Sequence, residues 1–445
     1  MALCLGHGFT LVLTSGGSVR GIGRLATIGV AGPDSDEEYV SDHEVGTVVE
    51  MTADDFGGSQ VVMMSGRLHS WACVTQDGAV WTTGMAFGTH TAPLRIDKQL
   101  FGKSRAVMVA CGFAFGMLLT ESGEVWTCGH DTYGELGHGN HNDCAVMTRV
   151  NPLSFHGERI TFIATGGEHS MALSAGGSHL WTWGDNRYRL GVLGRDNDVP
   201  PGGTDAIFAV PGLVAANTFN GVPVRSMTAS GYFTIVLTVD GSMWGCGGNR
   251  YGQLGFESED NRHLLQRVGG ANIFGEGGVR MVSCQENSTV ILSDLGQIWS
   301  CGEYYERNPT LLPTTNDFDN GGFACIASGR HHSAMLTEDG RLFTFGDTAH
   351  GCLGHHVNWH GWIMDAHIVA IPLPDGEQIG RWHPMPPNEQ HRALSFAQGT
   401  QGRLGEFCDH NKLSSELLEM VWDFLHFRPS THAGTGLRNL MGFRF

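Results

Sequence analysis

The sequence is poor in charged residues, and lysine is the scarcest of the basic ones. Only 16% of its 445 residues are Asp, Glu, Lys or Arg, and three of the 27 basic residues are lysines. With 45 acidic residues, the net charge is 27 − 45 = −18 at pH 7. Binding nucleic acid through its phosphates needs a basic patch. We therefore expect no direct contact with nucleic acid.

Long apolar runs and paired cysteines are lacking as well. No stretch approaches the ~18 consecutive apolar residues that a helix needs to span a bilayer, so we expect no membrane segment. The start, Met1–Leu5, has neither the basic flank nor the cleavage site of a signal peptide. The 11 cysteines are odd in number and include no C-x-x-C pair, which argues against a disulfide framework or a zinc ribbon. We expect free thiols and an intracellular, reducing compartment, either cytoplasm or nucleus.

Glycine, in contrast, is abundant: 65 of 445 residues, about twice its usual share. A helical bundle is excluded, because each glycine inside a helix costs about 1 kcal/mol relative to alanine. Disorder is excluded too, since 41% of the residues are hydrophobic and can build a core. The composition indicates a turn-rich, all-β chain.

A short phrase recurs along the chain: a large residue followed three positions later by glycine. The copies are Trp81 with Gly84, Trp126 with Gly129, Trp181 with Gly184, Trp244 with Gly247, Trp299 with Gly302 and Phe343 with Gly346, after a degenerate copy at Arg20–Gly23. Their glycines lie 61, 45, 55, 63, 55 and 44 residues apart. An apolar strand and a glycine turn precede each copy, so each unit reads as a hairpin with flanking strands. Units of this size stack into a β-propeller.

The repeat also accounts for most residues that suggest chemistry. Cys128, Cys246 and Cys301 share the position before the closing glycine with Thr83, Trp183 and Phe345, as expected of buried, inert thiols. The histidines and Cys352 within His350–His360 are residue types that bind zinc. His350 and Cys352, however, fall inside the Gly-x-Leu-Gly tail of a repeat. We predict no metal and no cofactor.

Several copies resemble the regulator-of-chromosome-condensation repeat. The matching segments are Gly166–Asn186, Trp244–Gly255 and Gly329–Gly346, and seven copies span about residues 1–354. The resemblance implies a seven-bladed β-propeller of four-stranded antiparallel blades. The repeat's histidine slot departs from this pattern, holding Phe9, Phe115, Phe233 and Ser288 in four copies, with His69 offset by one residue. If that histidine braces the blade by a hydrogen bond, these blades must use packing instead.

We assign residues 1–400 to the propeller and 401–445 to a tail. Because the chain begins inside a repeat, we expect the first blade to lack its leading strands and to be completed by closing strands at about 367–400. In the tail, Leu417, Val421 and Leu425 share one face of a predicted short helix over 414–427, which either packs on the propeller or recruits a partner. Propeller and tail together are loosely similar to repeat proteins of large DNA viruses, so a virion component is one expectation.

Two insertions interrupt the repeats. The first, 31–66, carries nine acidic residues and no Lys or Arg, half of the net charge. Three interpretations stand: a solvated loop, a docking site for a basic surface of a protein partner, or a carboxylate metal site. The residues that would contact the partner are Asp34, Asp36, Glu37, Glu38, Asp42 and Glu44. The second insertion, 195–222, is predicted to be a loop over one face.

No catalytic motif is recognisable, neither Gly-x-Ser-x-Gly, nor His-Glu-x-x-His, nor a Gly-Lys-Ser/Thr phosphate loop. We therefore predict no enzyme activity and no catalytic residues. The favoured function is a protein–protein interaction or assembly scaffold. The alternative, which the resemblance implies for some family members, is guanine-nucleotide exchange on a small GTPase. Light sensing by the plant ultraviolet photoreceptor needs a Gly-Trp-Arg-His-Thr phrase, whereas the matching segments here are Gly112–Gly116 and Gly166–Ser170, without that tryptophan.

Overall fold

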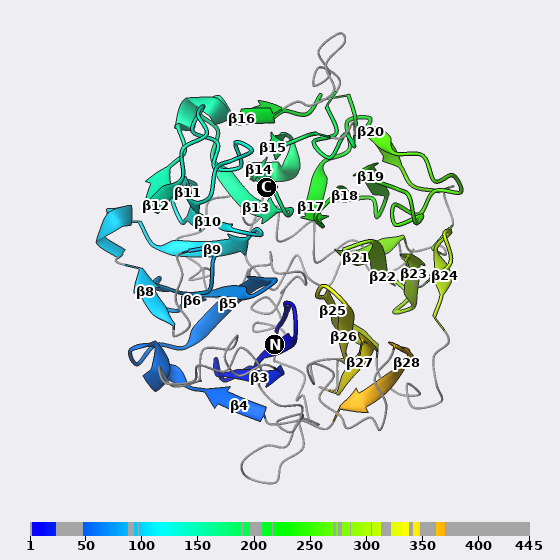
Figure 1. The fold of residues 1–445 in the computed structure, drawn as a ribbon, viewed down its shortest axis with the longest axis horizontal. Helices are drawn as coiled ribbons and strands as arrows, with labels where there is room; N and C mark the ends of the chain where they lie inside the picture. Colours follow the sequence, from blue (N-terminus) through cyan, green and yellow to red (C-terminus); the bar gives the residue numbers. More distant parts are fainter. Residues whose placement is uncertain are drawn as a thin grey trace, which may run out of the picture.

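The computed structural model describes most of residues 2–369. The described ranges are 2–23, 48–87, 93–96, 98–102, 104–187, 190–195, 207–215, 217–269, 273–274, 278–284, 286–303, 305–312, 322–337, 341–347 and 362–369. Within them the strands form seven antiparallel sheets of four strands each, arranged as blades around an axis (Figure 1). The predicted propeller is confirmed. The tail and its helix lie outside the described residues.

Each blade is built from consecutive strands. The first three blades are β1 to β4 (Ala2–Leu5, Phe9–Leu13, Val19–Gly23, Val48–Met51), β5 to β8 (Val61–Arg67, Ser70–Thr75, Val80–Thr83, Leu94–Ile96) and β9 to β12 (Ala106–Cys111, Phe115–Thr120, Val125–Gly129, Cys144–Arg149). Blades 4 and 5 are β13 to β16 (Ile160–Thr165, His169–Ser174, Leu180–Asp185, Ile207–Leu213) and β17 to β20 (Val224–Ala229, Phe233–Thr238, Met243–Gly247, Arg262–Arg267). Blades 6 and 7 are β21 to β24 (Val279–Cys284, Ser288–Ser293, Ile298–Gly302, Thr310–Leu311) and β25 to β28 (Phe323–Ser328, His332–Thr337, Leu342–Asp347, Trp362–Val369).

The propeller closes differently from our expectation. The first blade takes all four of its strands from residues 2–51, and its inner strand β1 contacts β25 of the last blade directly. Trp362–Val369, which includes the predicted closing residue His367, is the outer strand of blade 7. The expectation was wrong because Ala2–Leu5 is itself the missing leading strand. Residues 370–400 lie outside the described residues, so the boundary at 400 stays a prediction.

The repeated tryptophan lies in the third strand of blades 2 to 6 and packs on a phenylalanine that follows the outer strand of the preceding blade. Edge-to-face pairs join Phe56 to Trp81, Phe101 to Trp126, Phe155 to Trp181, Phe219 to Trp244 and Phe274 to Trp299, with centroids 5.4–5.9 Å apart. Three of these phenylalanines end short 3-10 helices, Ala53–Phe56, Lys98–Phe101 and Pro152–Phe155. Such pairs contribute about 1 kcal/mol beyond the area they bury. The pairs fasten each of these five blades to the connection that leads into it from the preceding blade.

The slot that faces the closing glycine holds a histidine in blades 4 and 7, a phenylalanine in blades 1, 3 and 5, and Ser288 in blade 6. His169 Nε2 lies 2.9 Å from Thr234 Oγ1 of the next blade, and His332 Nε2 lies 2.9 Å from Thr10 Oγ1 across the closing seam. Burial lowers the pKa of both histidines to about 3, so they stay neutral. Phe9, Phe115 and Phe233 fill the same slot in blades 1, 3 and 5 and are buried, as the sequence led us to expect.

The closing glycine of each repeat lets two strands approach closely. Gly247 has a φ of 106°, and a Cβ there would lie 2.6 Å from the carbonyl oxygen of Tyr232. Only glycine tolerates both conditions. The neighbouring thiols of Cys128, Cys246 and Cys301 are buried, in agreement with a packing position, and burial raises the pKa of Cys128 to about 12.

Candidate functional site

The antiparallel register separates the propeller into two faces. Phe9 pairs with Gly23, and Phe115 with Gly129, so the turn between the first two strands lies at the same end of a blade as the connection from the third strand to the fourth. We call this end the turn face. The opposite end carries the hairpins between the second and third strands. Side chains of the first turns therefore meet around the axis on the turn face.

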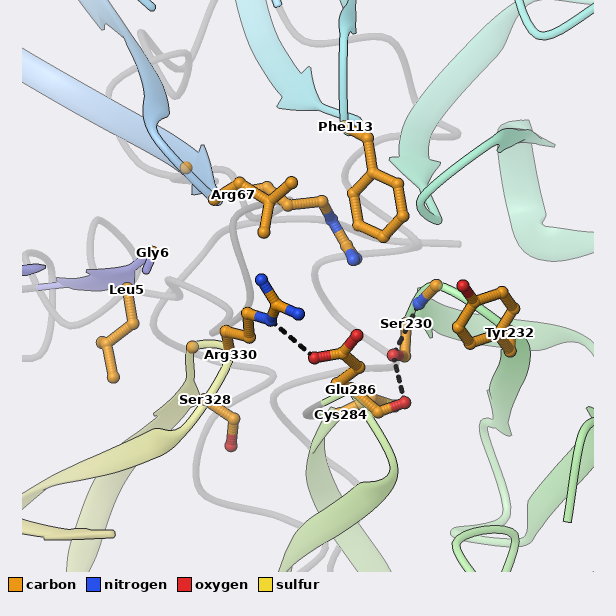
Figure 2. A pocket seen from close by; sticks show the side chains of 14 residues that line it. Leu5, Gly6, Arg67, Phe113, Ser230, Tyr232, Cys284, Glu286, Ser328 and Arg330 are labelled. Atoms are coloured by element: carbon orange, nitrogen blue, oxygen red, sulfur yellow. Dashed lines mark hydrogen bonds and ion pairs between the residues drawn. The ribbon is translucent and has the colours of Figure 1, made fainter. Parts of the chain in front are cut away.

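A cavity of about 240 Å³ lies where these turns converge. Six of the seven blades contribute to it, and Figure 2 shows charged and aromatic side chains pointing into it. The residues that carry its chemistry are Arg67, Phe113, Tyr232, Glu286 and Arg330. A second cavity, about 170 Å³, lies on the opposite face between blades 3 and 4 and includes Glu124, Arg149 and Arg159. The cavity on the turn face is the larger and draws on more blades.

Arg67 reaches across the axis from the end of β5. Its Nη2 donates to the carbonyl of Ala229 at 2.6 Å and to that of Thr165 at 3.4 Å, both on inner strands of other blades. The guanidinium carbon lies 5.7 Å from the centroid of the Phe113 ring. Burial within the propeller lowers the pKa of Arg67 to about 10, which leaves it charged at neutral pH. Arg67 thus places a positive charge in the middle of the turn face.

Arg330 and Glu286 form an ion pair on the wall of the cavity. Arg330 Nε donates to Glu286 Oε2 at 2.7 Å, and the two side chains are 40% and 28% exposed. Ser230 Oγ donates to the carbonyl of Glu286 at 2.9 Å and fixes that turn. Figure 2 shows the terminal nitrogens of Arg330 pointing into the cavity.

Three histidines that follow cavity-lining residues in the chain lie close to one another near the closing seam. His7 Nδ1 lies 3.3 Å from His69 Nε2, and the rings of His7 and His331 are 5.5 Å apart. These three side chains come from the first, second and last blades. Among the described residues, no group of three His, Cys, Asp or Glu side chains could hold a metal ion.

The acidic residues assigned to partner binding, Asp34, Asp36, Glu37, Glu38, Asp42 and Glu44, lie outside the described residues. Other acids of the same insertion have structural contacts: Glu50 accepts from Arg20 at 3.2 Å, and Asp55 accepts from the backbone N–H of Thr52 at 2.7 Å. Gly23 and Val48, which bound the undescribed part of the insertion, are at the turn-face end of blade 1.

The second insertion is partly described by the structure, and the zinc candidate lies outside the described residues. Part of the second insertion, 195–222, forms the outer strand β16, where a loop was predicted, while 196–206 lies outside the described residues. The zinc candidate His350–His360 also lies outside them. No described helix has the length and apolar character needed to cross a bilayer.

The cavity residues were missed by sequence reasoning. Arg67, Phe113 and Arg330 each follow the glycine at the start of the first turn, and Glu286 holds the equivalent position after Gln285, so four different side chains stand at one position of the repeat. Variation at equivalent positions of a repeat is the signal that could have found them, because side chains there are free of the packing that fixes their neighbours.

Comparison with known proteins agrees with this architecture. Patterns of the regulator of chromosome condensation (RCC1) repeat match residues 122–173, and also 107–135, 224–253 and 323–352. The chain is 28% identical over 321 residues to the ultraviolet-B receptor UVR8 of Arabidopsis thaliana, covering 68% of each. It spans between 6% and 68% of the length of the curated relatives it matches.

Solved structures show the same fold. Human WBSCR16 superposes with a TM-score of 0.62 at 19% identity, covering 82% of this chain and 94% of that one. Prp20p of Saccharomyces cerevisiae, whose structure is described with its binding properties to Gsp1p and histones, gives 0.50 at 18% identity, covering 95% and 85%. Together with the repeat matches, the seven blades show that this chain is a seven-bladed β-propeller that contains RCC1 repeats.

Proposed function

We propose that the protein is a non-catalytic interaction scaffold that binds a protein partner through the turn face. The observation that carries this proposal is the axial cavity: a rigid propeller holds charged and aromatic side chains from variable turn positions of several blades in one place. Such placement is typical of recognition, in which a fixed scaffold presents side chains on loops. Gly23 and Val48, the described residues on either side of 24–47, lie on the same face, which supports the proposal that a basic patch on the partner meets the acidic residues near this face.

The test compares two ion pairs of similar exposure on opposite faces. Arg330–Glu286 on the turn face spans 2.7 Å with side chains 40% and 28% exposed. Arg149–Glu124 on the other face spans 2.8 Å with side chains 44% and 23% exposed. We expect affinity capture from the source cells to lose its specific partner in Arg330→Gln and to keep it in Arg149→Gln, whose side chain is 44% exposed against 40% for Arg330. Equal capture by both variants would remove the turn face from the proposal.

Deletion of residues 34–44 tests the contribution of the acidic insertion. Loss of the same partner, with a weaker dependence of the remaining binding on salt, would support a basic partner surface. Unchanged capture at every salt concentration would leave the insertion as solvated surface.

A second candidate function is guanine-nucleotide exchange on a small GTPase, and the similarity to Prp20p in fold favours it. Release of a labelled GDP from a panel of GTPases measures it directly. Acceleration of one member, reduced in the Arg330→Gln variant, would establish exchange through the turn face. An unchanged rate across the panel would remove this candidate.

We also propose a reducing intracellular compartment. The nine described cysteines are all free, and eight of them are buried. Their state after purification without reductant, measured by mass spectrometry, tests this proposal: a native disulfide would contradict it.

A further inference from the structure

The axial cavity is a local positive site on an acidic protein. The whole chain carries −18, yet the charged side chains that line the cavity are Arg67, Arg330 and Glu286, which sum to +1. A cleft of one charge sign concentrates ligands of the opposite sign and speeds their association. The ligand of this cavity should therefore carry negative charge.

Arg67 is the less compensated of the two cations. The contacts of its guanidinium are the two backbone carbonyls and the face of Phe113, and no carboxylate lies within ion-pair distance of it among the described residues. A partly buried cation held by neutral dipoles gains more from an incoming anion than a solvated one does, since the local dielectric is low.

Arg330 uses its Nε–H to bind Glu286, and its two terminal nitrogens are oriented to donate to a ligand in the cavity. Its Nε holds Glu286, while its terminal nitrogens point into the cavity, toward the side where the guanidinium of Arg67 lies (Figure 2). Guanidinium groups bind planar, two-oxygen anions through paired N–H donors, and carboxylates fit that geometry. Glu286 itself shows that a carboxylate binds at this wall.

The volume and the lining of the cavity restrict the kind of molecule that can bring the carboxylate into it. The cavity of about 240 Å³ is below the ~300 Å³ at which pockets for whole small molecules begin. Phe113 and Tyr232 provide apolar surface for one or two methylene groups. We infer that the cavity receives the carboxylate of an Asp or Glu side chain of the partner protein, between Arg67 and Arg330. This inference rests on the proposed binding of a partner through the turn face.

Glu286 gives the inference its sharpest consequence. Its carboxylate already partly neutralises the charge of Arg330 through their ion pair, so it competes with the incoming carboxylate. Glu286→Gln removes that competing charge and is expected to strengthen binding roughly tenfold, whereas Arg330→Gln weakens it by about the same factor. A merely structural ion pair would predict that the two variants weaken binding equally.

The experiment uses the full chain and a pentapeptide, acetyl-Gly-Gly-Glu-Gly-Gly-amide, with its Gln counterpart as control. Ligand-observed NMR titration gives the apparent Kd for the wild type, Glu286→Gln, Arg330→Gln and Arg67→Lys. The matched controls are Arg149→Gln and Glu124→Gln on the opposite face. We expect binding of the Glu peptide only, opposite changes in the two turn-face variants, and no change in the controls.

Arg67→Lys keeps the charge but loses the fork of donors, and its thermal unfolding shows whether the propeller remains folded. Equal binding of the Gln peptide would overturn the inference. So would free glutarate that binds as tightly as the peptide, since the ligand would then be a small acid, or inorganic phosphate that binds more tightly than either. Failure of the peptide to bind while Arg330→Gln still abolishes partner capture would reject this inference and leave the proposed function standing.

Discussion

In blades 3 and 5 the connections from the third to the fourth strand share one pattern of backbone hydrogen bonds, but the accepting side chains are carboxylates in blade 3 and amides in blade 5. In blade 3, Leu136 N–H donates to Asp131 Oδ1 and Tyr133 N–H to Glu135 Oε2, while Asp131 N–H donates to Asp143 Oδ1. In blade 5 the equivalent acceptors are Asn249, Gln253 and Asn261, at similar distances of 2.9, 3.0 and 3.1 Å. Three carboxylates thus stand where the other blade has three amides.

The comparison shows that this connection requires an acceptor oxygen at each of three positions and accepts either a carboxylate or an amide there. Each position needs only one acceptor oxygen, which Asp and Asn, or Glu and Gln, supply equally well. The remaining atom makes the difference: the amide nitrogen of Asn249 donates to the carbonyl of Ser258, whereas Asp131 Oδ2 is buried with no hydrogen-bond partner among the described residues. Burial raises the pKa of Asp131 to about 6 and that of Glu135 to about 8. The connection in blade 3 is therefore most stable when Asp131 and Glu135 are protonated.

The largest effect is expected from making blade 5 acidic. Asn249→Asp replaces the donor to Ser258 by a carboxylate oxygen that faces a carbonyl, in a fully buried position. We expect a loss of about 3 kcal/mol in the free energy of unfolding at pH 7.5. Urea unfolding measures it. Asn261→Asp, at an exposed position, is the control and should change stability by less than about 0.5 kcal/mol. Similar losses in both variants would refute the role of burial.

The second effect comes from the reverse change in blade 3. Because the folded-state pKa values of Asp131 and Glu135 are raised, their contribution to stability is greatest below their ordinary values of 3.8 and 4.5 and is lost as pH rises through about 6 for Asp131 and about 8 for Glu135. Asp131→Asn/Glu135→Gln should remove that loss. We expect little difference at pH 5 and a gain on the order of 2 kcal/mol at pH 8.5.

Two exposed carboxylates provide the control for net charge. Glu121→Gln/Asp260→Asn removes the same number of carboxylates, at side chains 51% and 82% exposed, and should leave the pH dependence of stability between pH 5 and 8.5 in place. If this variant flattens the pH profile as much as the buried pair does, general charge repulsion is responsible.

The third effect concerns how each connection is held by the next blade. The carbonyl of Gln253 accepts from Thr289 Oγ1 at 2.7 Å and from the weakly donating Cys301 thiol at 3.7 Å. The carbonyl of Glu135 accepts from Ser170 Oγ at 2.8 Å and from Trp183 Nε1 at 2.9 Å. Thr289→Val should therefore cost about 1.5 kcal/mol and Ser170→Ala only about 0.5, since the Trp183 donor remains. Equal losses in thermal or urea unfolding would contradict this explanation.

The sequence predicted the repeated parts of the molecule and little of the cavity. The seven units followed from the spacing of residues such as Trp126 and Gly129, because packing and backbone constraints recur in each blade. Phe155 was missed as the partner of Trp181 because it lies in a connection of variable length. Arg67 and Arg330 are far apart in the chain and meet only when the propeller closes. Closure itself was predicted wrongly, since the short run Ala2–Leu5 was not read as a strand.

The smallest effect isolates the aromatic residue of the two connections. The guanidinium carbon of Arg187, from blade 4, lies 3.5 Å from the centroid of the Tyr133 ring, whereas Arg250, a sequence neighbour, lies 5.8 Å from that of the more exposed Tyr251. Arg187 is also held by Asp185 at 2.8 Å, so its position over Tyr133 is fixed. Tyr133→Leu should therefore cost about 1 kcal/mol in urea unfolding and Tyr251→Leu only a few tenths. Addition of Arg187→Gln should remove this difference, because the contact across the seam, rather than the tyrosine alone, distinguishes the two connections. If Tyr133→Leu still costs more stability than Tyr251→Leu in the Arg187→Gln background, the difference comes from packing of the tyrosine ring and not from its contact with Arg187.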